Sequence, residues 1–147
     1  TQQEMFEKLV AAYEKASADL GVRLIRTGEA VQLARETQPV KYVPYNPEEL
    51  KTLKHPAELP SQDGSMVFGY KWDKRKNKET GAEEWFIRND PAHLNNRGRY
   101  LQACLWYGFL FDKPTSDIKF DPKELTPEDA AFLRATAQKI LDAHKQK

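Results

Sequence analysis

The sequence contains a single cysteine, Cys104, which excludes an internal disulfide framework and any zinc site built from several cysteines. Cys104 lies within an apolar stretch that we predict to be helical. A thiol in such surroundings is usually buried and unreactive, because an apolar environment disfavours the thiolate. We therefore expect Cys104 to contribute to the core and not to take part in chemistry.

Long apolar runs are also missing. The longest, Ala103–Phe111, is far shorter than the roughly 20 residues that a membrane-spanning helix needs, so we expect no membrane span. The first residues show neither the basic segment nor the apolar segment of a secretory signal. The residues themselves therefore do not indicate a cellular compartment.

An excess of charge of one sign is the third absence. The chain has 23 basic and 22 acidic residues, a net charge of +1, so no overall field favours nucleic acid or an anionic membrane. The lysines and arginine between Lys71 and Lys78 are interrupted or flanked by acidic residues, which is typical of a solvated loop. With 147 residues, 39% hydrophobic and 31% charged, the chain is expected to form one globular domain.

The N-terminal third predicts a helix followed by a strand. Apolar residues recur every three or four positions over residues 3–20, Gly21 is suited to end that helix, and Val22–Ile25 has the composition of a short strand. A second short helix is expected from Thr27. Helix, glycine and strand together form the second half of a βαβ unit, which needs an earlier strand to pair with. The predicted fold class is therefore α/β, with the chain beginning in the middle of the fold.

Residues 39–65 predict an irregular surface excursion rich in proline, with one or two helical turns at 48–54. A β-hairpin is expected over residues 66–88, because apolar side chains alternate on both sides of a polar stretch at 73–81. The aromatic residues Tyr70, Trp72 and Trp85 belong to this hairpin. They suit either a platform that binds a sugar ring or the inner face of the sheet.

Two further helices are predicted after the hairpin. The first is capped by Asn95 or Asn96 and runs to about Phe111; it is apolar nearly all round, which indicates a buried helix. The second begins with Thr126-Pro127-Glu128-Asp129, an N-cap followed by proline and acidic residues in the first turn.

Between the hairpin and the first of these helices, Asp90 stands three residues before His93. A carboxylate in that position can fix one imidazole nitrogen, which leaves the other free to accept a proton from a nucleophile. The alternatives are a turn aspartate before Pro91 and a histidine that caps the helix. Metal binding needs a third ligand nearby, and the other histidines, His55 and His144, lie in distant segments. We therefore expect neither a metal nor a cofactor.

The motif has a family resemblance. Asp90-Pro91-Ala92-His93-Leu94-Asn95, with Gly98 and Tyr100–Cys104, resembles the C-terminal catalytic block of SGNH (GDSL-like) serine hydrolases. A looser similarity covers residues 21–30, which look like a strand and helix start of sugar-active members. The resemblance implies a three-layer α/β/α sandwich, ester hydrolysis that includes carbohydrate esters or acetylated sugars, and a secreted or periplasmic setting. It implies that His93 is the general base and that Asp90 orients it.

Two other parts of the family pattern are not visible in this sequence: the Gly-Asp-Ser motif of the nucleophile, and the glycine and asparagine of the oxyanion hole. Asp63-Gly64-Ser65 has the same residues in another order and precedes a strand. We therefore interpret the chain as the C-terminal part of such a hydrolase, with the nucleophile on polypeptide outside it, and inactive alone. The alternative is a non-catalytic carbohydrate-binding or interaction domain derived from a hydrolase fold.

Overall fold

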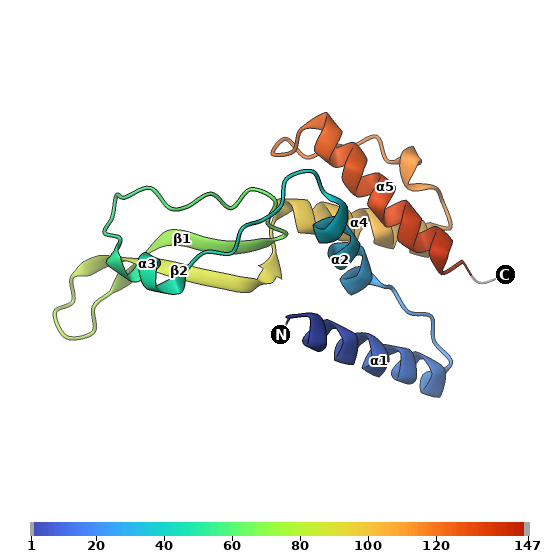
Figure 1. The fold of residues 1–147 in the computed structure, drawn as a ribbon, viewed down its shortest axis with the longest axis horizontal. Helices are drawn as coiled ribbons and strands as arrows, with labels where there is room; N and C mark the ends of the chain where they lie inside the picture. The colour runs from blue at the N-terminus through green and yellow to red at the C-terminus, as the bar shows by residue number, and fades with distance from the viewer. Residues whose placement is uncertain (1, 146–147) are drawn as a thin grey trace.

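The computed structural model describes residues 2–145, which form a mixed structure that is 50% helical and 15% strand. Four helices, α1, α2, α4 and α5, gather at one end, and a two-stranded hairpin with the short α3 beside it projects from them (Figure 1). In chain order the elements are α1 (Gln2–Leu20), α2 (Thr27–Thr37), α3 (Pro47–Thr52), β1 (Val67–Lys76), β2 (Glu83–Leu94), α4 (Asn96–Phe111), a 3-10 turn (Thr115–Asp117) and α5 (Pro127–Ala143). Over the described residues, no helix combines the length and apolar character that crossing a membrane requires.

The predicted hairpin is present and is longer than expected. Strands β1 and β2 pair antiparallel from Val67 opposite Leu94 to Lys76 opposite Glu83. The side chain of Asn77 closes the tip by accepting hydrogen bonds from the backbone of residues 79 and 80. Near the helices the register shifts: Gly69 lies opposite Asp90, so three residues of β2 (91–93) face only one residue of β1. Such a bulge bends a strand and re-aims its side chains.

The core lies where α2, α4 and α5 meet. Its fully buried members include Ala34, Leu101, Cys104, Leu105 and Leu133. Cys104 is buried in the core, as expected, and burial raises the pKa of its thiol to about 11. The cap of α5 is also as predicted.

A polar network joins the helical core to the base of the hairpin. The guanidinium of Arg97, at the start of α4, donates to both carboxylate oxygens of Asp129 at 2.6 and 2.7 Å. It also donates to the buried Gln38 at 3.0 Å, and Gln38 in turn donates to the carbonyl of Gly64 at 2.8 Å. Charge-assisted bidentate contacts of this kind are strong and directional. The network therefore fixes the start of α4 against the segment that leads into β1.

The prediction of a strand at Val22–Ile25 is wrong. Residues 22–26 are irregular, and the only strands in the described range are those of the hairpin. Gly21 does end α1, in the left-handed conformation (φ +64°). A parallel strand exists only through hydrogen bonds to a neighbour, and nothing within residues 2–145 lies beside this segment as a strand.

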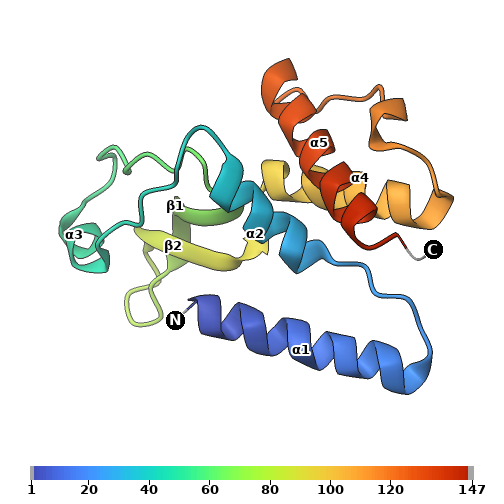
Figure 2. The same cartoon turned by 45° about the vertical axis from the view of Figure 1, so that its right-hand side comes forward.

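The prediction that α4 is buried all round is wrong on one side. Trp106 and Leu110 of α4 are 44% and 57% exposed, although the opposite face of the helix forms the core. Helix α1 likewise leaves Met5, Leu9 and Tyr13 exposed. Figures 1 and 2 show α1 alongside α2 and set apart from α5. Local composition marked these faces for burial, but no described element covers them.

Candidate functional site

The structure brings Asp90 and His93 into direct contact. Oδ1 of Asp90 lies 2.8 Å from Nδ1 of His93 and accepts a second hydrogen bond, at 3.1 Å, from the backbone N–H of the same residue. We predicted both residues in a loop, but they lie in the last part of β2. Asp90 directly precedes the bulge, and His93 is its last residue. The bulge is what allows a residue three positions on to fold back onto the carboxylate, since an unbroken strand would keep the two apart.

The contact assigns different roles to the two imidazole nitrogens. Because ionised Asp90 can only accept, the Nδ1 facing it carries the proton in the neutral ring. Nε2 is then the basic nitrogen, and no described residue forms a hydrogen bond with it. The His93 side chain is 76% exposed and that of Asp90 only 19%. Asp90 thus orients the His93 imidazole, whose basic nitrogen Nε2 is open to solvent or to a partner.

Contact with His93 lowers the pKa of the Asp90 carboxyl below its ordinary value of 3.8. The ring hydrogen bond is the largest cause and the backbone N–H of His93 is the second. A lowered pKa means that the folded state holds the carboxylate more readily than the unfolded chain does. The resulting stabilisation is complete above the ordinary pKa and is lost as the pH falls through the lowered value.

We predict that His93→Ala raises the pKa of Asp90 towards 3.8 without restoring it fully, because the backbone hydrogen bond remains. Carbon-13 NMR of the Asp90 carboxyl during an acid titration measures both values. The replacement His144→Ala is the control, since His144 pairs with Glu29 and not with Asp90. An unchanged Asp90 titration in the His93 variant would mean that the two side chains do not interact in solution.

Ser65, the serine of the reordered Asp-Gly-Ser sequence, lies in the turn that leads into β1. Its side chain is buried, donates to the carbonyl of Val67 at 2.8 Å and accepts from the backbone N–H of Val67 at 3.2 Å. Both of its hydrogen-bonding functions therefore serve the turn. The geometry offers no free hydroxyl at Ser65 for His93 to deprotonate.

The aromatic candidates Trp72 and Trp85 lie further along the hairpin, and both contact the imidazole of His55. The imidazole of His55 stacks on the Trp85 ring at 3.8 Å and meets the Trp72 ring edge-on at 5.5 Å. The ammonium of Lys74 lies over the Trp85 ring at 4.8 Å. Nε1 of Trp72 donates to the carbonyl of Ala57. The contacts of His55 and Ala57 hold the proline-rich excursion against the hairpin, and Trp85 remains 45% exposed.

Tyr70 is the aromatic candidate closest to the dyad along the strands, because it follows Gly69, the partner of Asp90. Its ring lies 6.4 Å from that of Tyr45, in a tilted arrangement. The side chain of Gln62 binds both the N–H and the carbonyl of Tyr70, each at 2.7 Å, as a neighbouring strand would. Tyr70 thus lies near the base of the hairpin, on the same face as Trp72 and Trp85, and its ring contact is with Tyr45.

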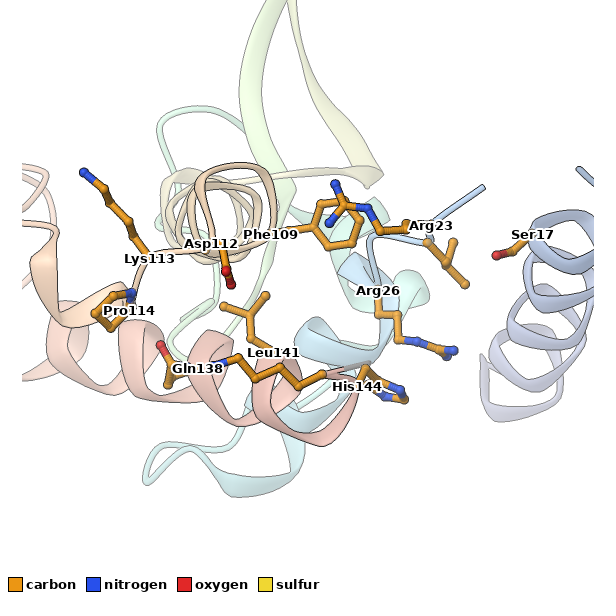
Figure 3. Close-up of a pocket in the computed structure, with 13 residues that line it drawn as sticks. Ser17, Arg23, Arg26, Phe109, Asp112, Lys113, Pro114, Gln138, Leu141 and His144 are labelled. Carbon is orange, nitrogen blue, oxygen red and sulfur yellow. The ribbon is translucent and has the colours of Figure 1, made fainter. Parts of the chain in front are cut away.

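A cavity lies in another part of the molecule. It has a volume of about 750 Å³ and opens between residues 23–26 and the C-terminal ends of α4 and α5 (Figure 3). In it, the guanidinium of Arg23 lies over the ring of Phe109 at 4.5 Å. Neither Asp90 nor His93 lines this cavity. Across residues 2–145, no three histidine, cysteine, aspartate or glutamate side chains gather closely enough to hold a metal ion.

Comparison of the chain with protein-family models, with curated proteins and with solved structures finds no match. The site therefore has to be interpreted from its own geometry.

Proposed function

We propose that this chain supplies the base and its orienting acid to a serine hydrolase of the SGNH type, which cleaves esters and takes carbohydrate esters as substrates. His93 is the general base, and Asp90 holds its tautomer and stabilises the imidazolium. The hydroxyl nucleophile and the oxyanion-binding groups belong to polypeptide outside this chain. The one observation that carries the proposal is the 2.8 Å contact between Asp90 Oδ1 and His93 Nδ1, with Nε2 left open.

In the proposed reaction, Nε2 of His93 removes the proton of the serine hydroxyl as its oxygen attacks the ester carbonyl. The carbonyl oxygen becomes an oxyanion and the imidazole becomes an imidazolium facing the Asp90 carboxylate. The imidazolium then gives its proton to the departing alkoxide, which leaves an acyl-serine. A water molecule, deprotonated by the same nitrogen, cleaves that second ester and regenerates the serine. Asp90 remains ionised throughout.

The exposed apolar surface supports the part of the proposal that requires further polypeptide. Soluble proteins rarely leave large apolar side chains exposed together, and here α1 and α4 each present a row of them. In the irregular segment between α1 and α2, the backbone N–H groups of residues 23–25 make no backbone hydrogen bond within the described range. Apolar helix faces, together with backbone N–H groups that lack a backbone acceptor, are features that an added sheet covers in a three-layer sandwich.

We predict that purified residues 1–147 hydrolyse an unactivated ester, an acetylated sugar, no faster than the same chain with His93→Ala. An alkoxide is a poor leaving group, so without a serine nucleophile and an oxyanion hole an oriented imidazole adds little to the spontaneous reaction. Acetate release, followed for both proteins at equal concentration, measures the difference. Turnover that depends on His93 and passes through a covalent acyl-enzyme would instead place the nucleophile within this chain.

The gene that encodes the chain offers an independent test of the proposed function. A Gly-Asp-Ser sequence directly after a predicted strand, in the same reading frame or in a chain that co-purifies with this one, is the expected result. Its serine should be labelled by a fluorophosphonate, and the labelling should depend on His93. If the natural protein has no such serine, the non-catalytic alternative replaces the hydrolase.

A further inference from the structure

Besides the hydrogen bond that its backbone carbonyl accepts from Arg99 inside α4, Asn95 makes four others at the junction of β2 and α4. Its Oδ1 accepts from the backbone N–H of Gly98 at 3.1 Å, which is the cap of α4. Its Nδ2 donates to the carbonyls of Ser65 at 2.8 Å and Val67 at 3.1 Å. Its backbone N–H donates to the carbonyl of Met66 at 3.1 Å. Both N–H donors of the side-chain amide are therefore used, and three of these four bonds reach across to the residues around the start of β1.

These contacts exceed what a helix cap requires. Serine, threonine, aspartate and asparagine all cap helices well, because each offers an oxygen to the first turn. Among them, only asparagine also offers an amide with two N–H donors. The two bonds from Nδ2 use that difference, since both acceptors belong to another element of the chain.

Asn95 lies just beyond the end of the bulge, so its hydrogen bonds to the start of β1 restrain the bulge. Residues 91–93 stand outside the regular ladder, which is anchored on one side by the pairing of Asp90 with Gly69 and on the other by Leu94 with Val67. Asn95 comes directly after that second anchor and two residues after His93. A bulge held at both ends has few conformations, whereas one released at either end has many.

We propose that Asn95 is a positioning residue, whose amide clamps the end of β2 to β1 and thereby holds His93 against Asp90. The importance of this clamp for turnover rests on the proposed hydrolase function, but its effect on the geometry of the dyad does not.

The test compares Asn95→Ser with Asn96→Ser in the 147-residue chain. Serine at position 95 keeps a neutral cap for α4 and lacks the two amide donors. Asn96, one residue later, is exposed and has no side-chain hydrogen bond within the described residues, so it is the matched control. Two NMR measurements are made: hydrogen exchange of the His93 backbone N–H, which is bonded to Asp90, and the titration of the Asp90 carboxyl.

For Asn95→Ser we expect hydrogen exchange of the His93 backbone N–H to be accelerated roughly tenfold. That factor corresponds to the free energy of about one hydrogen bond. The Asp90 pKa should rise towards its ordinary value, while the amides of Leu101 and Leu105 in α4 keep their protection. Asn96→Ser should change none of these. Unchanged exchange at His93 in Asn95→Ser, or the same change in both variants, would overturn the proposal.

If Asn95→Ser does not fold, Asn95→Asp provides the same test, because aspartate is an equally good cap and also lacks the two donors. Its added charge alters the Asp90 titration directly, so only the exchange of the His93 amide is read. Neither measurement uses ester hydrolysis. The two proposals can therefore fail separately. The protein can prove to be a His93-dependent hydrolase in which Asn95 does not hold the bulge, or Asn95 can hold the bulge in a protein that has no hydrolase activity.

Discussion

Replacing His93 by alanine in the protein that contains both this chain and the nucleophile should lower kcat/KM for ester hydrolysis by about 10⁶-fold, the scale for losing the base of a hydrolytic triad. The loss should fall mainly on kcat, because His93 acts on the proton of the nucleophile and not on substrate binding. Folding should be almost unaffected, since the side chain is largely exposed. Steady-state kinetics together with thermal unfolding measures both effects.

The matched control for this prediction is His144→Ala. His144 follows α5 and pairs with Glu29 at 2.9 Å, away from the hairpin, so its loss should leave kcat/KM within about twofold. If His93→Ala kept the parental activity, His93 would be removed from the mechanism. If both variants lost activity equally, the loss would be a general consequence of replacing a histidine and not of losing the base.

Gly98→Ala should destabilise the fold by about 1–3 kcal/mol, the range expected for overpacking. A Cβ at this position would lie 2.4 Å from the carbonyl oxygen of Met66 and 2.8 Å from a methyl group of Leu94. The first of these is backbone and cannot move aside by rotating a side chain. Because Gly98 also donates to Asn95, the strain falls on the junction that carries the dyad. Urea unfolding followed by circular dichroism measures the change in unfolding free energy.

Gly28→Ala is the control for that substitution. Gly28 lies in the first turn of α2, and its nearest neighbour would be a ring carbon of Phe6 at 3.7 Å, an ordinary contact. Alanine should therefore stabilise the helix there by about 0.5–1 kcal/mol. A destabilisation by Gly28→Ala as large as that by Gly98→Ala would show that the loss of glycine itself, and not the clash with Met66, causes the effect.

The elements predicted correctly are those whose signal is local. The N-cap Thr126 followed by Pro127 predicts the start of α5, and alternation over residues 66–72 predicts β1. The elements predicted wrongly depend on partners: Val22–Ile25 has the composition of a strand but no neighbouring strand, and the apolar face of α4 has no cover. The composition of a segment indicates which structure suits it. Whether the segment adopts that structure depends on a neighbouring segment that pairs with it or covers it.

The candidate site was predictable in its members but not in its geometry. The spacing of Asp90 and His93 indicated a pair, and the structure places them in contact at 2.8 Å. The bulge that makes the contact possible has no clear local signal, because it arises from how β2 registers against β1. For the same reason Asn95 was predicted only as a cap: its other acceptors lie some 30 residues earlier in the chain.

By itself, the sequence determined that the chain mixes helices and strands, with one cysteine in an apolar helix, a hairpin and a carboxylate three residues before a histidine, because these follow from composition and short-range periodicity. Only the tertiary structure decided that the two side chains meet, that Nε2 of His93 remains open, and that a clamp from Asn95 to the start of β1 closes the bulge around them. Contacts between distant segments depend on register and on packing, and neither is encoded in the spacing of neighbouring residues.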